Sequence, residues 1–326
     1  MVSSARRRIR FTIAIAAIIV SVTIVVIALQ NVLTAAAFPR LSRVETDFSA
    51  AYLQRELSSL AAESPQTIFL GDSVLWGFRL PAERSAVSIL AQHGCACRNL
   101  AFKSGSPPNA YAVVKLLIAK GIRPKAVVIE VNQKVLNASD ASYQALHPAV
   151  AALALPLLAP ADRATLKSSA PRSGPLQSRI DALLSSVWLT YAMRSDIREL
   201  IAPDADLVPS RPLTAEDLAG TYDLQPLTPK NVGVHYLTLT VRLLRRAGIP
   251  TIAFMTPTNH QLLHEYIDGP EYRRNTNYLI SLLRDGGVRV LDLDAAFPTR
   301  DFLDESHLTA AGNERLAAIL GAAIRR

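Results

Sequence analysis

Residues Thr67 to Phe78 read TIFLGDSVLWGF. An apolar run stops abruptly at Gly71-Asp72-Ser73, and bulky apolar residues then resume. This pattern is typical of a buried strand that ends in a tight turn. Ser73 is either an ordinary turn residue or a nucleophile held at the end of a strand. The stretch alone does not separate these two interpretations.

The rest of the chain alternates apolar strands with amphipathic helices. Continuous apolar strands separated by helices predict a parallel sheet that is covered on both faces. We therefore predict an α/β fold, a flavodoxin-like three-layer α/β/α sandwich with about five parallel strands. In such a sheet, ligands bind outside the carboxyl ends of the strands. Further strands are predicted at 97–102, 124–132, 250–257 and 288–293, and helices at 51–62, 82–94, 108–122, 228–249, 269–287 and 309–326.

One segment near the N-terminus is apolar on every side. Phe11 to Leu29 contains no charged residue, Gly or Pro, and its length fits a helix that crosses a bilayer. Four arginines in residues 1–10 precede it and favour a cytoplasmic N-terminus. We therefore predict a basic N-terminus at 1–10, a transmembrane anchor at 11–29, a stalk or linker helix at 30–66 and an extracytoplasmic domain at 67–326. A cleaved signal peptide is the alternative, since small residues in 33–38 suit a peptidase.

Composition limits the remaining classes. The net charge of the 326 residues is +8, and half of that equals the four arginines before the apolar segment. Basic and aromatic residues are not interleaved, so nucleic-acid binding is not expected. Neither a metal ion nor an organic cofactor is implied. Cys95 and Cys97 lack neighbouring His or Cys at metal-binding spacing, and an oxidising compartment would allow a local disulfide if the chain bends between them.

The middle of the chain, about 137–226, interrupts the alternation. It is rich in Ala, Leu and Pro, and the prolines exclude a membrane span. We interpret it as a helical insertion after the third strand. A lid, a partner-docking surface, a membrane-facing patch and plain cover for the sheet edge all remain open.

The last strand is followed by Asp304-x-x-His307, just before the final helix. In the predicted sheet this loop lies at the same edge as Ser73. A serine hydroxyl becomes a good nucleophile when a base removes its proton and a third group orients that base. We therefore predict that Ser73, His307 and Asp304 form a catalytic triad. Asn259 and His260, after the fourth strand, are candidates for substrate contact at the same edge.

The motifs FLGDSVLWG and DESHLTAAGNERLA resemble those of the SGNH (GDSL-type) hydrolase superfamily, from about Thr67 to the end but without the insertion. The resemblance implies a serine esterase or acyltransferase with an oxyanion hole. Its donors would be the backbone N–H groups of Ser73 and Gly105 and the side chain of Asn132. In the second block, Asn99 and Gly105 stand one residue further apart than expected, and Ser104 could replace Gly105. The third block lacks the usual Gly and Asp around Asn132, with Asn137 as a second choice.

Anchored members of this superfamily modify acyl groups on cell-envelope polymers. The resemblance therefore implies a membrane-anchored, periplasmic O-acyltransferase or esterase, acting on an exported polysaccharide through an acyl-serine intermediate. An acyl-ester donor, a glycan acceptor or water, and a multispanning membrane acyltransferase would be its partners. An anchored lipid esterase or lysophospholipase is one alternative, and a non-catalytic scaffold subunit of an acyltransferase complex is another.

Overall fold

A computed structural model of the chain forms two compact units, Met1–Asp47 with Ala170–Val208, and Phe48–Ser169 with Pro209–Arg326. The described residues are 2–37, 48, 50–63, 66–136, 141–166, 180, 183–184, 187–192, 222 and 225–325.

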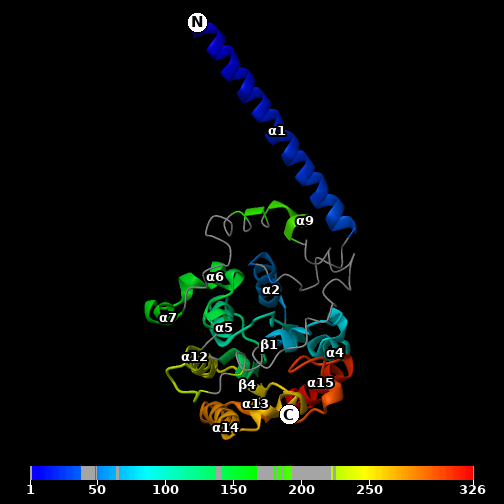
Figure 1. Cartoon of the computed structure of the whole chain (residues 1–326), viewed down its shortest axis with the longest axis vertical. Coiled ribbons are helices and arrows are strands. Elements are labelled where there is room, and N and C mark those ends of the chain that lie inside the picture. The colour runs from blue at the N-terminus through cyan, green and yellow to red at the C-terminus, as the bar shows by residue number, and fades with distance from the viewer. Residues whose placement is uncertain are drawn as a thin grey trace. The chain divides into compact units, whose positions relative to one another are not determined.

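The first unit contains the apolar segment as one continuous helix, α1 (Val2–Ala37) (Figure 1). An 18-residue window, Ala17–Thr34, has a mean hydropathy of 2.3, and 6% of it is buried. This helix is long and apolar enough to cross a membrane, as an anchor or as a signal sequence. The short helix α9 (Leu189–Ala192) belongs to the same unit, and the side chain of Asn31 accepts a hydrogen bond from the backbone N–H of Leu189.

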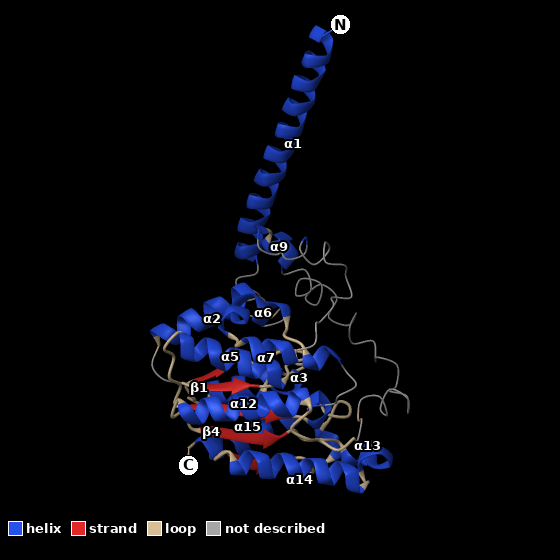
Figure 2. Cartoon of the chain, turned by 90° about the vertical axis from the view of Figure 1, so that its left-hand side faces the viewer, coloured by secondary structure: helices blue, strands red, loops and turns tan. Residues whose placement is uncertain are grey.

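The second unit is built on a five-stranded parallel sheet with the order β2-β1-β3-β4-β5. Figure 2 shows the red strands surrounded by blue helices. The strands are β1 (Thr67–Leu70), β2 (Cys97–Asn99), β3 (Ala126–Val131), β4 (Thr251–Met255) and β5 (Arg289–Asp292). The predicted three-layer α/β/α fold is confirmed. Because the chain moves from β1 to β2 on one side and then to β3 on the other, the fold switches direction between β1 and β3. Parallel α/β sheets bind ligands at such a switch point.

Helices cover both faces of the sheet and bury alternate strand residues. On one face, Ile68 and Ile129 pack with α2, α5, α12 and α14. On the other, Phe69, Val128 and Phe254 pack with α3, α4 and α15. Burial of both sides explains why the strands are apolar without alternation. The bounds are α2 (Ala50–Ala62), α3 (Ser73–Trp76), α4 (Ala86–Gln92), α5 (Pro107–Ala119), α12 (Val232–Arg246), α13 (His260–Ile267), α14 (Pro270–Asp285) and α15 (Ala310–Ile324).

Part of the predicted insertion covers the core. Helix α6 (Pro148–Ala154) buries Ala149, Val150 and Ala154 in the cluster that also contains α2 and α5. Helix α7 (Pro160–Thr165) follows it. Helices α6 and α7 support the plain structural interpretation of the first part of the insertion, in which extra helices cover the core. Most of the predicted helix further along the insertion lies outside the described residues.

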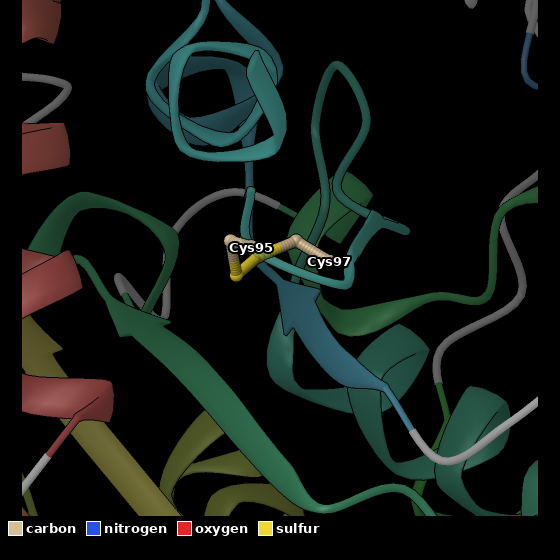
Figure 3. The surroundings of a disulfide bond; sticks show 2 residues. All are labelled: Cys95 and Cys97. Atoms are coloured by element: carbon tan, nitrogen blue, oxygen red, sulfur yellow. A yellow bond between two sulfur atoms is a disulfide. The ribbon is translucent and has the colours of Figure 1, made fainter. Parts of the chain in front are cut away.

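The two cysteines form a disulfide at the start of β2 (Figure 3). Their Cα atoms are 5.3 Å apart, closer than the spacing of residues i and i+2 in a straight strand. The bend is visible in the backbone, because the Cys97 N–H donates to the Cys95 carbonyl at 2.9 Å. The bridge therefore closes a local turn at the amino end of the strand, away from the edge that carries Ser73.

Candidate active site

The turn after β1 presents Ser73 as the first residue of α3. Asp72 is the N-cap of this helix, and its Oδ1 accepts a hydrogen bond from the Val74 N–H at 2.9 Å. The helix ends at Gly77, whose φ of +88° is favourable only for glycine. One short turn of helix therefore holds the serine at the carboxyl end of a central strand.

Ser73, His307 and Asp304 lie in hydrogen-bond contact, although 234 residues separate the serine from the histidine. Ser73 Oγ is 2.8 Å from His307 Nε2. His307 Nδ1 is 2.8 Å from Asp304 Oδ2 and 3.0 Å from Oδ1. This is the geometry of a hydroxyl, a base and a group that orients the base.

Asp304 is held in its ionised form. Burial by itself would raise the pKa of Asp304, but hydrogen bonds from the His307 side chain and backbone, together with the Ser306 N–H, lower it to about 2. The carboxylate therefore fixes the ring with Nδ1 as the donor and leaves Nε2 to accept a proton from Ser73.

Asn259 and Lys134 fasten the loop that carries Asp304 and His307. Asn259 donates from Nδ2 to the Asp304 carbonyl at 3.2 Å, and its backbone N–H donates to the Glu305 carbonyl at 2.9 Å. Lys134 Nζ lies 2.7 Å from Glu305 Oε1. The loop is thus tied to the ends of β3 and β4, the two strands that follow β1 in the sheet.

The two candidates for substrate contact are both engaged within the protein. Asn259 is buried and supports the triad loop as described. His260 Nε2 lies 2.9 Å from Asp294 Oδ2, and this hydrogen bond raises the pKa of His260. Tyr272 donates its hydroxyl to the other oxygen of Asp294 at 2.6 Å. Contact with a substrate stays a prediction for both residues. In the structure, Asn259 supports the loop that carries Asp304.

The predicted oxyanion donors differ in their availability. The Ser73 N–H has no acceptor among the described residues. Asn132 Nδ2 donates one proton to Asp72 Oδ2 at 2.9 Å, and its second N–H has no acceptor in the described part of the chain. The Gly105 N–H already donates to the Phe102 carbonyl at 2.9 Å. The predicted donor role of Gly105 therefore does not fit this geometry.

Gly105 instead allows two loops to approach each other closely. A Cβ atom at this position would lie 2.0 Å from the Gly71 carbonyl oxygen, so no larger residue fits without a shift of the backbone. Asn99 is also structural, since it donates from Nδ2 to the Leu75 carbonyl at 3.1 Å. Ser104 is exposed, and Asn137 lies outside the described residues.

Glu130 is the residue that sequence reasoning missed. Its Oε2 accepts the backbone N–H groups of Asp72 at 2.9 Å and Leu75 at 3.4 Å, and its Oε1 accepts the Thr256 hydroxyl at 3.1 Å. Burial, together with the nearby carboxylate of Asp72, raises the pKa of Glu130 well above its usual range. A single charged residue inside the otherwise apolar strand 126–131 was the available signal.

Comparisons with known proteins give a family-model match and several similar solved structures. A protein-family model matches residues 229–326, and none of the curated proteins matches the chain. Among solved structures, a lipolytic protein of the G-D-S-L family from Desulfitobacterium hafniense is similar, with 12% identity over 79% of this chain and 99% of that chain, and a TM-score of 0.40.

Two further solved structures are similar at the same level. The crystal structure of TesA shares 12% identity over 80% of this chain and 98% of that chain, with a TM-score of 0.41. A catalytic mutant of Axe2, an acetylxylan esterase from Geobacillus stearothermophilus, shares 13% identity over 80% of this chain and 94% of that chain, with a TM-score of 0.40. At these identities and TM-scores the likeness says nothing about activity, which depends on contacts within this chain.

Proposed function

We propose that this protein is a serine esterase or O-acyltransferase of the SGNH superfamily. The observation that carries the proposal is the contact chain from Ser73 Oγ through His307 to Asp304, with both joining distances at 2.8 Å. Such an arrangement deprotonates a serine hydroxyl during attack on a carbonyl carbon. Retention of all three residues in contact argues against the alternative of a non-catalytic scaffold.

The geometry supports a two-step reaction. Ser73 Oγ attacks the ester carbonyl while His307 Nε2 takes the serine proton, and the ester C–O bond then breaks as His307 returns that proton to the leaving alcohol. The Ser73 N–H and the Asn132 amide would stabilise the negative oxygen. In the second step His307 deprotonates a sugar hydroxyl or water, which attacks the acyl-serine and releases Ser73.

The size of the space beside the site favours a short acyl group. A cavity of about 30 Å³ lies between α5, α12 and the ends of β1 and β3, and Gly105 and Asn132 line it. By the same measure one water molecule needs about 10–15 Å³, so this space holds a group of about two or three non-hydrogen atoms. We therefore propose an acetyl or similarly small group as the acyl group, in preference to the long chain of a lipid.

We also propose where the protein acts, which polymer it meets and where the acyl group comes from. Helix α1 would anchor the protein in the cytoplasmic membrane with its N-terminus inside, as the four arginines before its apolar stretch favour. The second unit would then meet exported polysaccharide in the periplasm. A multispanning membrane acyltransferase would be a suitable source of the acyl group.

The test uses the purified full chain in detergent, with acetyl esters and an acetylated oligosaccharide as substrates. We expect Ser73→Ala to lower kcat by at least about 10³-fold, with loss of the acyl-serine seen by mass spectrometry. The control is Ser88→Ala, at a serine in α4 outside the triad. Equal activity in Ser73→Ala and the wild type would refute the nucleophile.

Acyl-chain length tests the choice between a small acyl group and a lipid. We expect kcat/KM to fall as the acyl group grows from acetyl to octanoyl, and Val113→Ala to relax this dependence because Val113 lines the cavity. Ile118→Ala on the same helix does not change the lining and is the control. A higher kcat/KM for octanoyl than for acetyl would support the lipid esterase instead.

A further inference from the structure

Aromatic and cationic side chains gather beside the triad in a group that the proposed reaction does not use. We call Trp76, Phe78, Arg79 and Lys103 the rim cluster. The Phe78 ring lies against the His307 ring, with 4.4 Å between their centroids. Because His307 contacts Ser73, a substrate bound at the serine would meet this cluster.

The rim cluster carries positive charge on aromatic faces. Lys103 Nζ is 4.6 Å from the Trp76 ring centroid and 5.5 Å from that of Phe78. Arg79 Cζ is 5.1 Å from the Phe78 centroid. Lys103 is exposed and forms no ion pair with any described residue. Its charge is thus positioned over the rings and open to an anionic ligand.

The loops that carry the two cations have an unfavourable backbone conformation. Arg79 has a φ of +62°, and Ser104, next to Lys103, has a φ of +61°. Residues with a side chain seldom adopt this left-handed region, and such strain is concentrated at ligand and catalytic sites. Both loops are therefore held in defined shapes beside Ser73, as a binding surface requires.

We propose that the rim cluster is a subsite for an anionic sugar, so that the polysaccharide substrate is acidic. This inference rests on the proposed function, whose substrate class it specifies. Aromatic rings pack against the C–H groups of a sugar ring, and Lys103 and Arg79 would pair with its carboxylate. Trp76 and Phe78 are half-buried, which suits contact with a sugar better than insertion into lipid.

The kinetic test compares two acetylated oligosaccharides of equal length, one with uronic acid residues and one neutral. With the full chain, we expect Lys103→Gln to raise KM for the acidic substrate about three- to five-fold, the range of a single exposed ion pair. The neutral substrate should keep its KM, and kcat should change little for both. The control is Lys120→Gln, at an exposed lysine that ends α5. Equal effects on both substrates would overturn the proposal.

A binding measurement separates this inference from the proposed function. Ser73→Ala protein is titrated with both oligosaccharides after removal of their acetyl groups, and affinity is measured by calorimetry. We expect tighter binding of the acidic one, reduced by Lys103→Gln. This result would support the subsite even in a protein without esterase activity. Lys103-dependent binding of glycerol phosphate, tighter than that of the acidic oligosaccharide, would indicate a lipid headgroup and overturn the proposal.

Discussion

A single buried carboxyl, that of Glu130, joins the turn at Ser73 to the central strand β3. It accepts two backbone N–H groups from the turn and one hydroxyl from Thr256. An unsatisfied buried donor costs about 1–3 kcal/mol. Glu130 therefore acts through the position of Ser73 and does not need to touch the substrate.

The role of Glu130 predicts different results for two substitutions. Glu130→Ala should lower the free energy of unfolding by about 2–4 kcal/mol and lower kcat, because the turn loses its acceptor. Glu130→Gln should retain most of the stability and most of kcat, since an amide can accept from the Asp72 N–H and donate to the Thr256 hydroxyl. Urea unfolding and kcat measurements check this, and equal losses in the two variants would contradict it.

The ionised state of Asp304 predicts a pH-dependent contribution to stability. Its pKa is about 2 in the folded protein and about 4 in an unfolded chain. The carboxylate thus stabilises the fold above pH 4, and this contribution disappears as the pH falls through 2. We expect Asp304→Asn to lower the free energy of unfolding by about 2 kcal/mol at pH 7, and by less at pH 3. Asp268→Asn, at an exposed position, is the control. If Asp304→Asn lowered the free energy of unfolding by the same amount at every pH, the lowered pKa of Asp304 would be contradicted.

At the scale of elements, the start of α15 fixes the triad loop. Asn313 is buried and donates from Nδ2 to the Leu308 and Thr309 carbonyls, while its Oδ1 accepts the Ala86 N–H. Thr309 caps the helix by accepting the Gly312 N–H. The motif after His307 therefore serves to position the loop between β5 and the final helix.

Gly312 provides a test of this packing. A Cβ atom there would lie 2.4 Å from the Asp301 carbonyl oxygen, which belongs to the backbone and cannot move alone. We expect Gly312→Ala to destabilise the protein by about 1–3 kcal/mol and to lower kcat through displacement of His307. Gly321→Ala is the matched control in the same helix, because its Cβ would meet only side-chain atoms of Leu90 and Arg325. Thermal unfolding and kcat are the measurements. A larger loss of stability or of kcat in Gly321→Ala than in Gly312→Ala would contradict the role of the close contact at Gly312.

For the whole molecule, α1 predicts retention in the membrane. We expect the full chain to stay in the membrane fraction after an alkaline wash, and the double change Ile19→Arg with Val22→Arg to reduce this, since each arginine costs about 2.5–3.5 kcal/mol at the centre of a span. The control is Ile19→Leu with Val22→Leu. Mass spectrometry of the mature chain decides between an anchor and a cleaved signal, because a chain that lacks α1 would refute the anchor.

The distance along the chain between interacting residues explains which parts of the site the sequence predicts. Ser73 and the Asp304-x-x-His307 motif carry distinctive residue types at the ends of strands, so sequence pattern and strand order bring them together. The oxyanion donors depend on which N–H groups other atoms already occupy, and this is why Gly105 was predicted as a donor although Phe102 accepts its N–H. Glu130 was missed because its partners, two backbone N–H groups and the Thr256 hydroxyl, belong to segments far from it in the chain.

The sequence by itself determined the parallel α/β sheet, the apolar helix near the N-terminus and the meeting of the three triad residues at one edge. These features depend on apolar periodicity and on the rule that parallel strands end at a common edge. Only the tertiary structure decided that Glu130 holds the turn at Ser73, that Asn259 and Lys134 hold the loop with Asp304 and His307, and that the Phe78 ring lies against His307. Each of these contacts joins loops far apart in the chain, so it depends on distances that no local pattern encodes.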